Sequence, residues 1–200
     1  MSSIVKTYLT PEQYLASERA AETKSEYFRG EVFALAGASL RHNLLVARLI
    51  EHLSPVVRRS GCEVYPSDLR VKISALGKYT NADVIVVCGK AELEDAHGDT
   101  LLNPSVIFEV LSESTERYDR GAKFLHYRKL ESLRAYVLVA QDTIGVEVYT
   151  RQEQGFWRYE AYEGLGAIVT IEPPGARFSL AELYEGVGLD LAPEVDAASR

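Results

Sequence analysis

The sequence has few of the residues that bind soft metals or build disulfide frameworks. It contains only two cysteines and four histidines among its 200 residues. Cys62 and Cys88 do not form a Cys-x-x-Cys motif, and the histidines are scattered rather than spaced as ligands. We therefore expect neither a zinc centre nor a redox motif, and we expect both cysteines to be free, buried thiols.

Long apolar runs are also missing. No apolar segment approaches the ~20 residues that a membrane-spanning helix requires. The first residues, Met1 to Lys6, contain no apolar stretch of signal-peptide length. The sequence predicts a cytoplasmic protein without a membrane partner.

Positive charge is in deficit, since 22 Lys and Arg residues face 29 Asp and Glu residues and the net charge is −7. A protein that coats nucleic acid with its whole surface needs an excess of basic residues to neutralise phosphates, so that class is excluded. Local binding stays open because basic residues cluster in two expected helices. They are Arg41, Arg48, Arg58, Arg59, Arg117, Arg120, Lys123, Arg128 and Lys129.

Length and composition predict one domain. A chain of 200 residues buries roughly 70% of its unfolded surface, and contents of 46% hydrophobic and 26% charged residues are ordinary for a globular protein. We expect a single domain over residues 1–186 and a C-terminal tail over residues 187–200.

Periodicity and turn residues predict a mixed order of helices and strands. Helices are expected at 10–19, 41–53, 118–130 and 180–184. Strands are expected at 32–36, 62–73, 81–87, 104–111, 135–140, 145–149 and 156–162, the last three as an antiparallel meander. This order predicts an α/β (α+β) fold in which helices flank a mixed central sheet.

Three segments carry more specific expectations. Pro55 predicts a kink or a break at the end of the second helix. Pro66 interrupts the strand at 62–73, which predicts a sheet edge or a bulge there. The polar and acidic segment 90–103 is expected to be a solvated loop.

Two acidic residues fall within apolar strands. Asp83 lies near the start of the run at 81–87, and Glu109 lies near the end of the run at 104–111. An unpaired carboxylate in such a place costs several kcal/mol and would normally protonate, whereas a shared divalent cation keeps both acids ionised. Oxygen ligands without a set of His or Cys favour Mg²⁺ or Mn²⁺. The alternative is that arginine or backbone groups satisfy each acid separately.

The helix that follows Glu109 supplies further polar candidates. Asp119, Lys123 and Tyr127 recur at intervals of four and share one helix face. Lys123 is placed to orient a water or to stabilise the transition state of phosphodiester hydrolysis. The simpler alternatives are an exposed Asp119–Lys123 salt bridge, worth ~0.3–0.5 kcal/mol, and a packing role for Tyr127. His42 is either a residue of the site mouth or ordinary surface.

These residues resemble a known family. The residues that carry the resemblance are Asn81-Ala82-Asp83, Glu109-Val110-Leu111-Ser112, Asp119, Lys123 and Tyr127, with Thr10 to Leu15, Gly30-Glu31-Val32 and Gly37 to Asn43. They resemble the Uma2-type restriction endonuclease family of the PD-(D/E)XK nuclease superfamily, over about residues 10–184. The resemblance implies a restriction-endonuclease-like αβββαβ core and a magnesium-dependent phosphodiesterase site.

The resemblance also implies roles for single residues. Asp83 and Glu109 would ligate the metal, with the carbonyl of Val110 as a further ligand, and Glu31 resembles an extra acid from an early element.

The usual superfamily motif has a lysine two residues beyond the second acid. That position here is Leu111, and Lys123 resembles the displaced lysine of some members.

The leading hypothesis is a metal-dependent endonuclease that hydrolyses phosphodiester bonds of DNA. One alternative is a catalytically inactive nucleic-acid-binding or assembly module with the same fold, which Leu111 and the negative charge favour. Another is a hydrolase of small phosphate esters. Trp157 and the neighbouring tyrosines are expected to fill one face of the meander, and an exposed aromatic face there would suit a homodimer interface.

Overall fold

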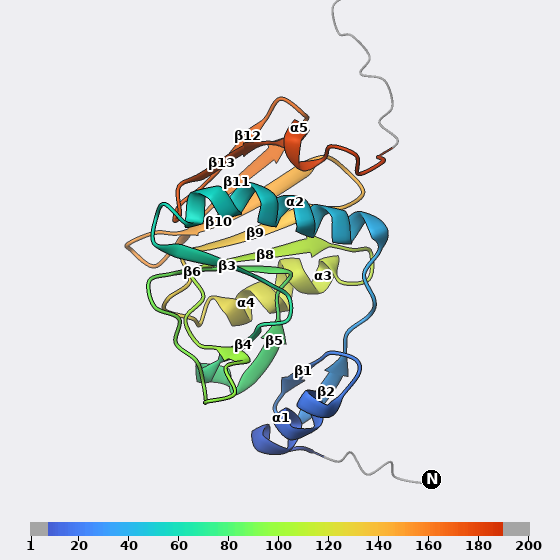
Figure 1. Cartoon of the computed structure of the whole chain (residues 1–200), viewed down its shortest axis with the longest axis vertical. Helices are drawn as coiled ribbons and strands as arrows, with labels where there is room; N and C mark the ends of the chain where they lie inside the picture. The colour runs from blue at the N-terminus through green and yellow to red at the C-terminus, as the bar shows by residue number, and fades with distance from the viewer. Residues whose placement is uncertain (1–7, 190–200) are drawn as a thin grey trace, which may run out of the picture.

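A six-stranded sheet forms the centre of the computed structural model, which describes residues 8–189 (Figure 1). The strand order is β11-β10-β9-β8-β6-β3. The bounds are β3 (Cys62–Pro66), β6 (Val84–Cys88), β8 (Val106–Leu111), β9 (Ala135–Ala140), β10 (Gly145–Arg151) and β11 (Trp157–Glu163). Strands β8 and β9 are parallel and the other neighbours are antiparallel. The predicted mixed sheet, α+β class and antiparallel meander are therefore confirmed.

The central strands bury both faces, which explains why they read as unbroken apolar runs. Val84, Val86 and Phe108 belong to the core cluster that contains the apolar residues of α2 (Leu40–Val57). Ile85 and Ile107 belong to the cluster on the opposite face, which contains Tyr127 of the later helix. Glu109 follows Ile107 by two residues, so its side chain lies on that second face.

The second sheet has five strands, in the order β2-β1-β5-β4-β7. The bounds are β1 (Ser25–Phe28), β2 (Glu31–Ala34), β4 (Arg70–Ile73), β5 (Lys78–Asn81) and β7 (Thr100–Leu101). Helix α1 (Pro11–Ala20) begins with the predicted Thr10 cap, in a capping box with Gln13. It packs on this sheet through Tyr14, whose ring centroid lies 5.1 Å from that of Tyr27.

One long hairpin joins the two sheets. Strand β3 is an edge of the six-stranded sheet, and after Pro66 the chain continues as β4 in the five-stranded sheet. A 3-10 turn, η1 (Ser74–Leu76), leads into β5, and the chain returns to the first sheet as β6. The interruption predicted at Pro66 is therefore the crossing between the sheets, and Asp83 lies at the matching crossing of the return arm.

The helix predicted at 118–130 is shorter and wider than expected. It consists of α3 (Glu116–Tyr118), a π-helical turn η2 (Asp119–Lys123) and α4 (Phe124–Tyr127). Single π turns inside helices occur frequently at functional sites. Here the π turn carries Asp119 and Lys123, both of which are buried.

Two expectations about covalent and backbone structure were wrong. Cys62 and Cys88 form a disulfide rather than free thiols, because they are directly opposite each other in the β3–β6 ladder. Spacing along the sequence does not reveal this strand register. Helix α2 also continues through Pro55 to Val57 without the expected break, although proline has no N–H to donate to the carbonyl four residues earlier.

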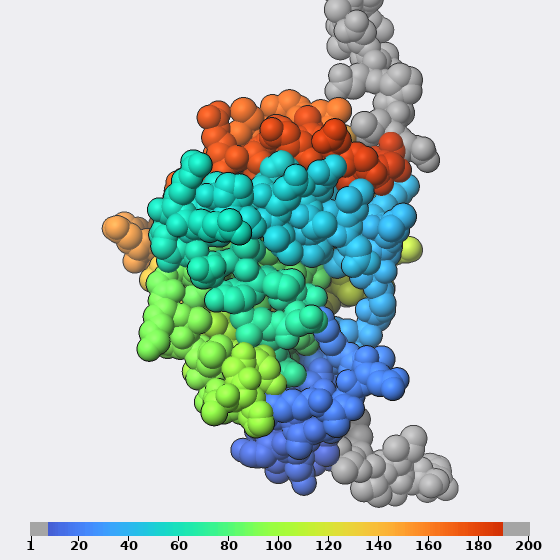
Figure 2. All heavy atoms as spheres, in the orientation of Figure 1, coloured from blue at the N-terminus to red at the C-terminus, as the bar shows by residue number. Residues whose placement is uncertain are grey.

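The segment 90–103 is more structured than a solvated loop. It contains β7, which pairs with β4 in parallel. Arg19 of α1 forms ion pairs with Asp95 at 2.9 Å and with Asp99 at 2.7 Å. Figure 2 shows this light green segment against the blue N-terminal residues. The acidic residues of this segment therefore hold α1 in place.

The C-terminal part adds a hairpin that the sequence did not reveal. Strands β12 (Ile168–Ile171) and β13 (Ala176–Ser179) lead into α5 (Leu180–Leu183), and they pack against α2. Val187, the first residue of the expected tail, is 4% exposed and belongs to the same core; residues 190–200 lie outside the described part. Between residues 8 and 189, no helix is both long and apolar enough to cross a bilayer.

Candidate active site

A cleft of about 1390 Å³ lies at the junction of the two sheets. Its walls come from β1 and β2, from the connection 35–39, from the first turns of α2, from the β5–β6 crossing and from the helical segment after β8. Asp83, Glu109, Asp119 and Lys123 all line it. The structure therefore brings four of the predicted site residues to one cleft.

Asp83 occupies the bend just before β6, and not the interior of the strand as expected. Its Oδ2 atom accepts a hydrogen bond of 2.7 Å from the backbone N–H of Val110 and lies 3.1 Å from Nε2 of His42. Its side chain remains 21% exposed. Asp83 is thus fixed by β8 and α2 while one side stays open to the cleft. Of the two alternatives for His42, the structure places it beside Asp83 and not on ordinary surface.

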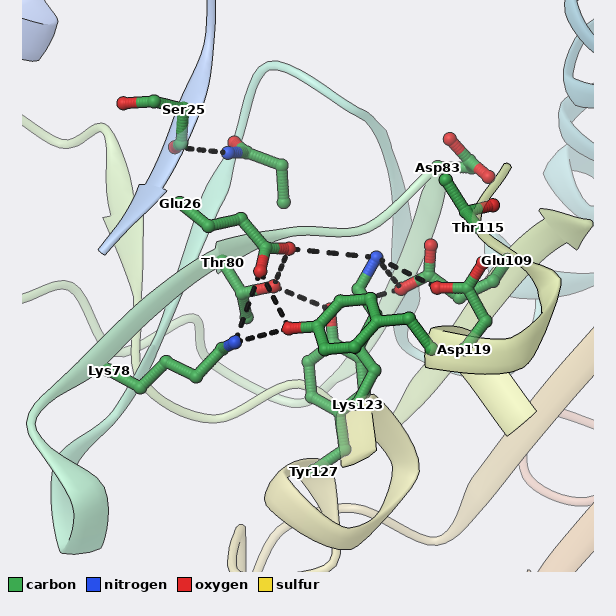
Figure 3. Close-up of polar contacts among 12 residues, drawn as sticks. Ser25, Glu26, Lys78, Thr80, Asp83, Glu109, Thr115, Asp119, Lys123 and Tyr127 are labelled. Atoms are coloured by element: carbon green, nitrogen blue, oxygen red, sulfur yellow. Dashed lines mark hydrogen bonds and ion pairs between the residues drawn. The ribbon is translucent and has the colours of Figure 1, made fainter. Parts of the chain in front are cut away.

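Glu109 is the buried acid of the cleft, with 3% of its surface exposed. Its Oε1 atom lies 2.9 Å from Nζ of Lys123 and accepts a hydrogen bond of 3.1 Å from the hydroxyl of Tyr127 (Figure 3). Leu111 points to the same face of β8 but packs in the core cluster that contains Tyr127. The ammonium group beside Glu109 is therefore supplied by the helix and not by the strand.

Lys123 is shared among three carboxylates. Besides Glu109, its Nζ atom lies 3.4 Å from Oδ1 of Asp119 and 3.7 Å from Oε1 of Glu26. Asp119 is 2% exposed and Lys123 is 6% exposed. The alternative of a solvent-exposed Asp119–Lys123 salt bridge was therefore wrong.

Glu26 is the acid that the sequence interpretation missed. Its Oε2 atom lies 3.1 Å from Nζ of Lys78 and accepts a hydrogen bond of 2.8 Å from the Tyr118 hydroxyl. The hydroxyl of Thr80 bonds its other oxygen. The signal in the sequence was weak, because a four-residue strand shows too little alternation to identify which side chains point inward.

Glu31, the expected early acid, lies farther along the same hairpin. It begins β2 and pairs with Phe28 across the ladder, whereas Glu26 pairs with Phe33. Glu31 is not among the described residues that line the cleft, and Glu26 is. The structure thus brings a different glutamate of this hairpin to Lys123, and a metal-binding role for Glu31 remains a prediction.

The electrostatics of the cleft favour an added cation. Burial raises the pKa of Glu109 well above its ordinary value; Lys123 opposes this rise, and the charges of Asp119 and Asp83 add to it. The pKa of Asp119 is raised as well, first by burial and then by Asp83. Burial alone would lower the pKa of Lys123, but the carboxylates of Glu109, Glu26 and Asp119 raise it, so the amine stays protonated. The shared ammonium therefore leaves Glu109 and Asp119 under-compensated, whereas the burial of Glu26 is outweighed by Lys123 and Lys78, which together lower its pKa.

The donor set fits a hard cation better than a soft one. In the part of the chain that the structure describes, no three His, Cys, Asp or Glu side chains are grouped closely enough to hold a metal by themselves. Asp83 and Glu109 with the carbonyl of Val110 would provide only oxygen ligands. Mg²⁺ is usually bound through one or two carboxylates while it keeps several waters. An incomplete set of oxygen ligands at the edge of an open cleft therefore suits Mg²⁺ or Mn²⁺.

Comparisons with known proteins agree with this architecture. The model of the Uma2 family, described as "Putative restriction endonuclease", matches residues 11–190. Two curated relatives come from Synechocystis. "Uncharacterized protein slr1290" is 32% identical over 90% of this chain and 93% of its own length. "Uncharacterized protein sll1609" is 35% identical over 74% of this chain and 84% of its own length.

A solved structure shares the fold. It is the crystal structure of "a putative nuclease belonging to DUF820" from Anabaena variabilis, with a TM-score of 0.73 and 19% sequence identity. The match covers 90% of this chain and 99% of that chain. At this identity the likeness concerns the fold alone.

Proposed function

The chain belongs to the Uma2 restriction endonuclease family, and on that premise we propose that it is a metal-dependent nuclease that hydrolyses phosphodiester bonds of DNA. One observation carries the proposal: a buried ammonium group, that of Lys123, lies 2.9 Å from Glu109 in a cleft that Asp83 also lines. A fixed positive charge in such a cleft suits phosphoryl transfer, because negative charge develops on the phosphate oxygens.

The metal belongs to the proposal. Asp83, Glu109 and the carbonyl of Val110 would hold Mg²⁺ or Mn²⁺. When bound, such an ion stabilises negative charge on the phosphate and lowers the pKa of a water.

The chain's own groups have distinct roles in this proposal. Lys123 stays protonated, since nearby carboxylates raise its pKa, so it acts as a fixed positive charge rather than as a general base. Tyr127 donates its hydroxyl to Glu109 and orients that carboxylate. The N–H of Val110 and the ring of His42 do the same for Asp83. These contacts hold the acids in position before substrate arrives.

A cleavage assay tests the proposal. Plasmid DNA and single-stranded DNA are incubated with Mg²⁺ or Mn²⁺ and the wild-type protein, Asp83→Asn or Glu109→Gln. The matched control is Glu51→Gln, because Glu51 is an exposed residue of α2 whose side chain is 62% accessible. We expect cleavage by the wild type and the control only. Equal cleavage by all four proteins would refute the site, since a contaminating nuclease would then account for it.

Calorimetry separates this proposal from an inactive module that merely keeps the fold. A metal-dependent enzyme binds Mn²⁺ through Asp83 and Glu109, so titration of the wild type gives a binding isotherm that Glu109→Gln weakens. Absence of Mn²⁺ binding together with absence of cleavage would favour the inactive module.

A homodimer is part of the proposal, because several large apolar side chains are exposed. Leu40 at the start of α2 is 87% exposed, and Tyr159 of the meander is 54% exposed. Sedimentation velocity over a range of concentrations tests it. A monomer at every concentration would contradict the dimer without affecting the nuclease proposal.

A further inference from the structure

The cleft beside the acids has an aromatic wall. Phe28 and Phe33 both line it. In the β1–β2 ladder Phe33 is directly opposite Glu26, and Phe28 lies two residues after Glu26. Residues opposite each other, and residues two apart on one strand, share a face of the sheet. Both rings therefore lie on the face from which Glu26 reaches Lys123.

The two rings differ in how much of their surface is free. Phe28 is partly buried, with the ring of His126 at a centroid distance of 5.1 Å and the guanidinium of Arg29 at 4.9 Å. Phe33 is 48% exposed. Its strand β2 is an edge of the five-stranded sheet. Phe33 thus offers an open ring next to the candidate active site.

The cleft has few cations for a duplex backbone. The described residues that line it include three lysines and no arginine, against five carboxylates. Each lysine already has an acidic partner: Lys24 pairs with Asp68, Lys78 with Glu26, and Lys123 with the three acids described above. Proteins that grip duplex DNA neutralise several phosphates with Lys and Arg. This cleft is poorly equipped to do so.

From this combination we infer that the substrate is single-stranded nucleic acid, whose unpaired bases stack on Phe33 while the adjacent phosphate enters the acidic site. The inference rests on the proposed nuclease function and specifies its substrate class. A base in a duplex cannot stack on the ring of Phe33, because its faces are already stacked on neighbouring pairs. Base–aromatic stacking is tolerant of sequence, since every base has a π face.

Fluorescence anisotropy tests the inference through binding, independently of cleavage. The probes are fluorescein-labelled oligodeoxythymidine and oligouridine of about 12 nucleotides, within the range of site sizes of single-strand-binding grooves, and a duplex of the same length. Ca²⁺, a hard cation with oxygen ligands, replaces Mg²⁺, and a gel verifies that the probes stay intact. The proteins are the wild type, Phe33→Ala, Phe33→Trp and the control Phe156→Ala. Phe156 is exposed to a similar degree, 54%, but is not among the described cleft residues.

We expect tighter binding of a single strand than of the duplex, whichever sugar it carries. Phe33→Ala should weaken single-strand binding about tenfold, which corresponds to about 1.4 kcal/mol, whereas Phe33→Trp and Phe156→Ala should keep it within about twofold. The slope of log K against log salt should be shallower than about −2, because each neutralised phosphate of a single strand contributes only about −0.7. All variants should melt at the wild-type temperature, since Phe33 is an exposed side chain.

Three results would overturn the inference. They are preferential duplex binding, single-strand binding that Phe33→Ala leaves unchanged, and a Phe33→Ala variant that only converts a dimer to a monomer. The last result would identify the aromatic wall as a subunit contact. Failure of the nuclease proposal gives a different result. A protein that binds single strands through Phe33 but cleaves no nucleic acid would support this inference and contradict the nuclease proposal.

Discussion

Replacing Lys123 by methionine removes the one ammonium group shared by Glu109, Glu26 and Asp119 while keeping a side chain of similar length. The change affects both catalysis and folding, since the amine lies 2.9 Å, 3.7 Å and 3.4 Å from the three carboxylates respectively. The two effects differ in size and in pH dependence, so they can be measured separately.

The catalytic effect follows from lost charge stabilisation. Removing one fixed group that stabilises transition-state charge typically costs about 10²–10³ in rate. The effect on stability is bounded by the cost of leaving buried acids without a partner, about 3–5 kcal/mol. Protonation of Glu109 reduces that cost. Its pKa is already raised by burial and rises further without Lys123.

The sign of the pH dependence follows from that raised pKa. The folded variant holds a proton on Glu109 that the unfolded chain does not, over the range from the ordinary glutamate pKa up to the raised one. The free energy of unfolding of Lys123→Met should therefore fall as pH rises through this range. We expect a loss of about 3 kcal/mol at slightly alkaline pH and a smaller loss in weak acid.

Single-turnover cleavage and urea unfolding at several pH values measure the two effects. Lys129→Met is the control, because Lys129 is an exposed residue just beyond the same helix. A cleavage rate that Lys123→Met leaves within about threefold of wild type would contradict the catalytic role, since the expected loss is about 10²–10³. A variant as stable as wild type at every pH would contradict the buried charge network.

Two further predictions concern the surroundings of this lysine, and a third concerns the disulfide. Mn²⁺ binding should strengthen as pH rises, because the pKa of Glu109 is raised and its proton competes with the metal. Calorimetry at increasing pH measures this change in affinity. An Mn²⁺ affinity that does not depend on pH would count against Glu109 as a ligand. Glu26→Gln should lower the cleavage rate without changing Mn²⁺ affinity more than about threefold, since Glu26 lies 3.7 Å from Lys123 and acts by positioning it. Loss of Mn²⁺ binding in this variant would instead make Glu26 a metal ligand. The Cys62–Cys88 disulfide spans a separation of 26 residues. Its reduction with dithiothreitol should lower the free energy of unfolding by about 3 kcal/mol while the circular dichroism spectrum stays native. An unchanged midpoint of urea unfolding would show that the bond contributes nothing to stability.

The features that the sequence predicted well are those with strong local signals. The apolar runs around Ile85 and Ile107 were predicted as buried strands, because covering both faces of a sheet leaves an unbroken hydrophobic pattern. The helix cap at Thr10 was also predicted, because capping involves residues only three apart in the sequence. The closeness of Lys123 to Glu109 was predicted from the helix that follows Glu109 and from the resemblance, in which Lys123 takes the place of the usual motif lysine at the position that is Leu111 here.

The features that escaped prediction depend on register and on contacts between distant segments. The disulfide needs Cys62 and Cys88 to be opposite each other across two strands, and nothing near either cysteine specifies that alignment. Glu26 reaches Lys123 only because β1 pairs with β5, a strand far along the chain, where Tyr27 is opposite Tyr79. Tertiary contacts between distant segments decide placement of this kind, and local sequence signals do not reveal them.

A Mn²⁺ soak of a crystal of this protein, read by anomalous scattering, tests the central claim most directly. The account predicts a peak in contact with the carboxylates of Asp83 and Glu109 and the carbonyl of Val110, with the ammonium of Lys123 beside it. A well-diffracting crystal with no peak between the two acids, or with a peak only elsewhere, would contradict it.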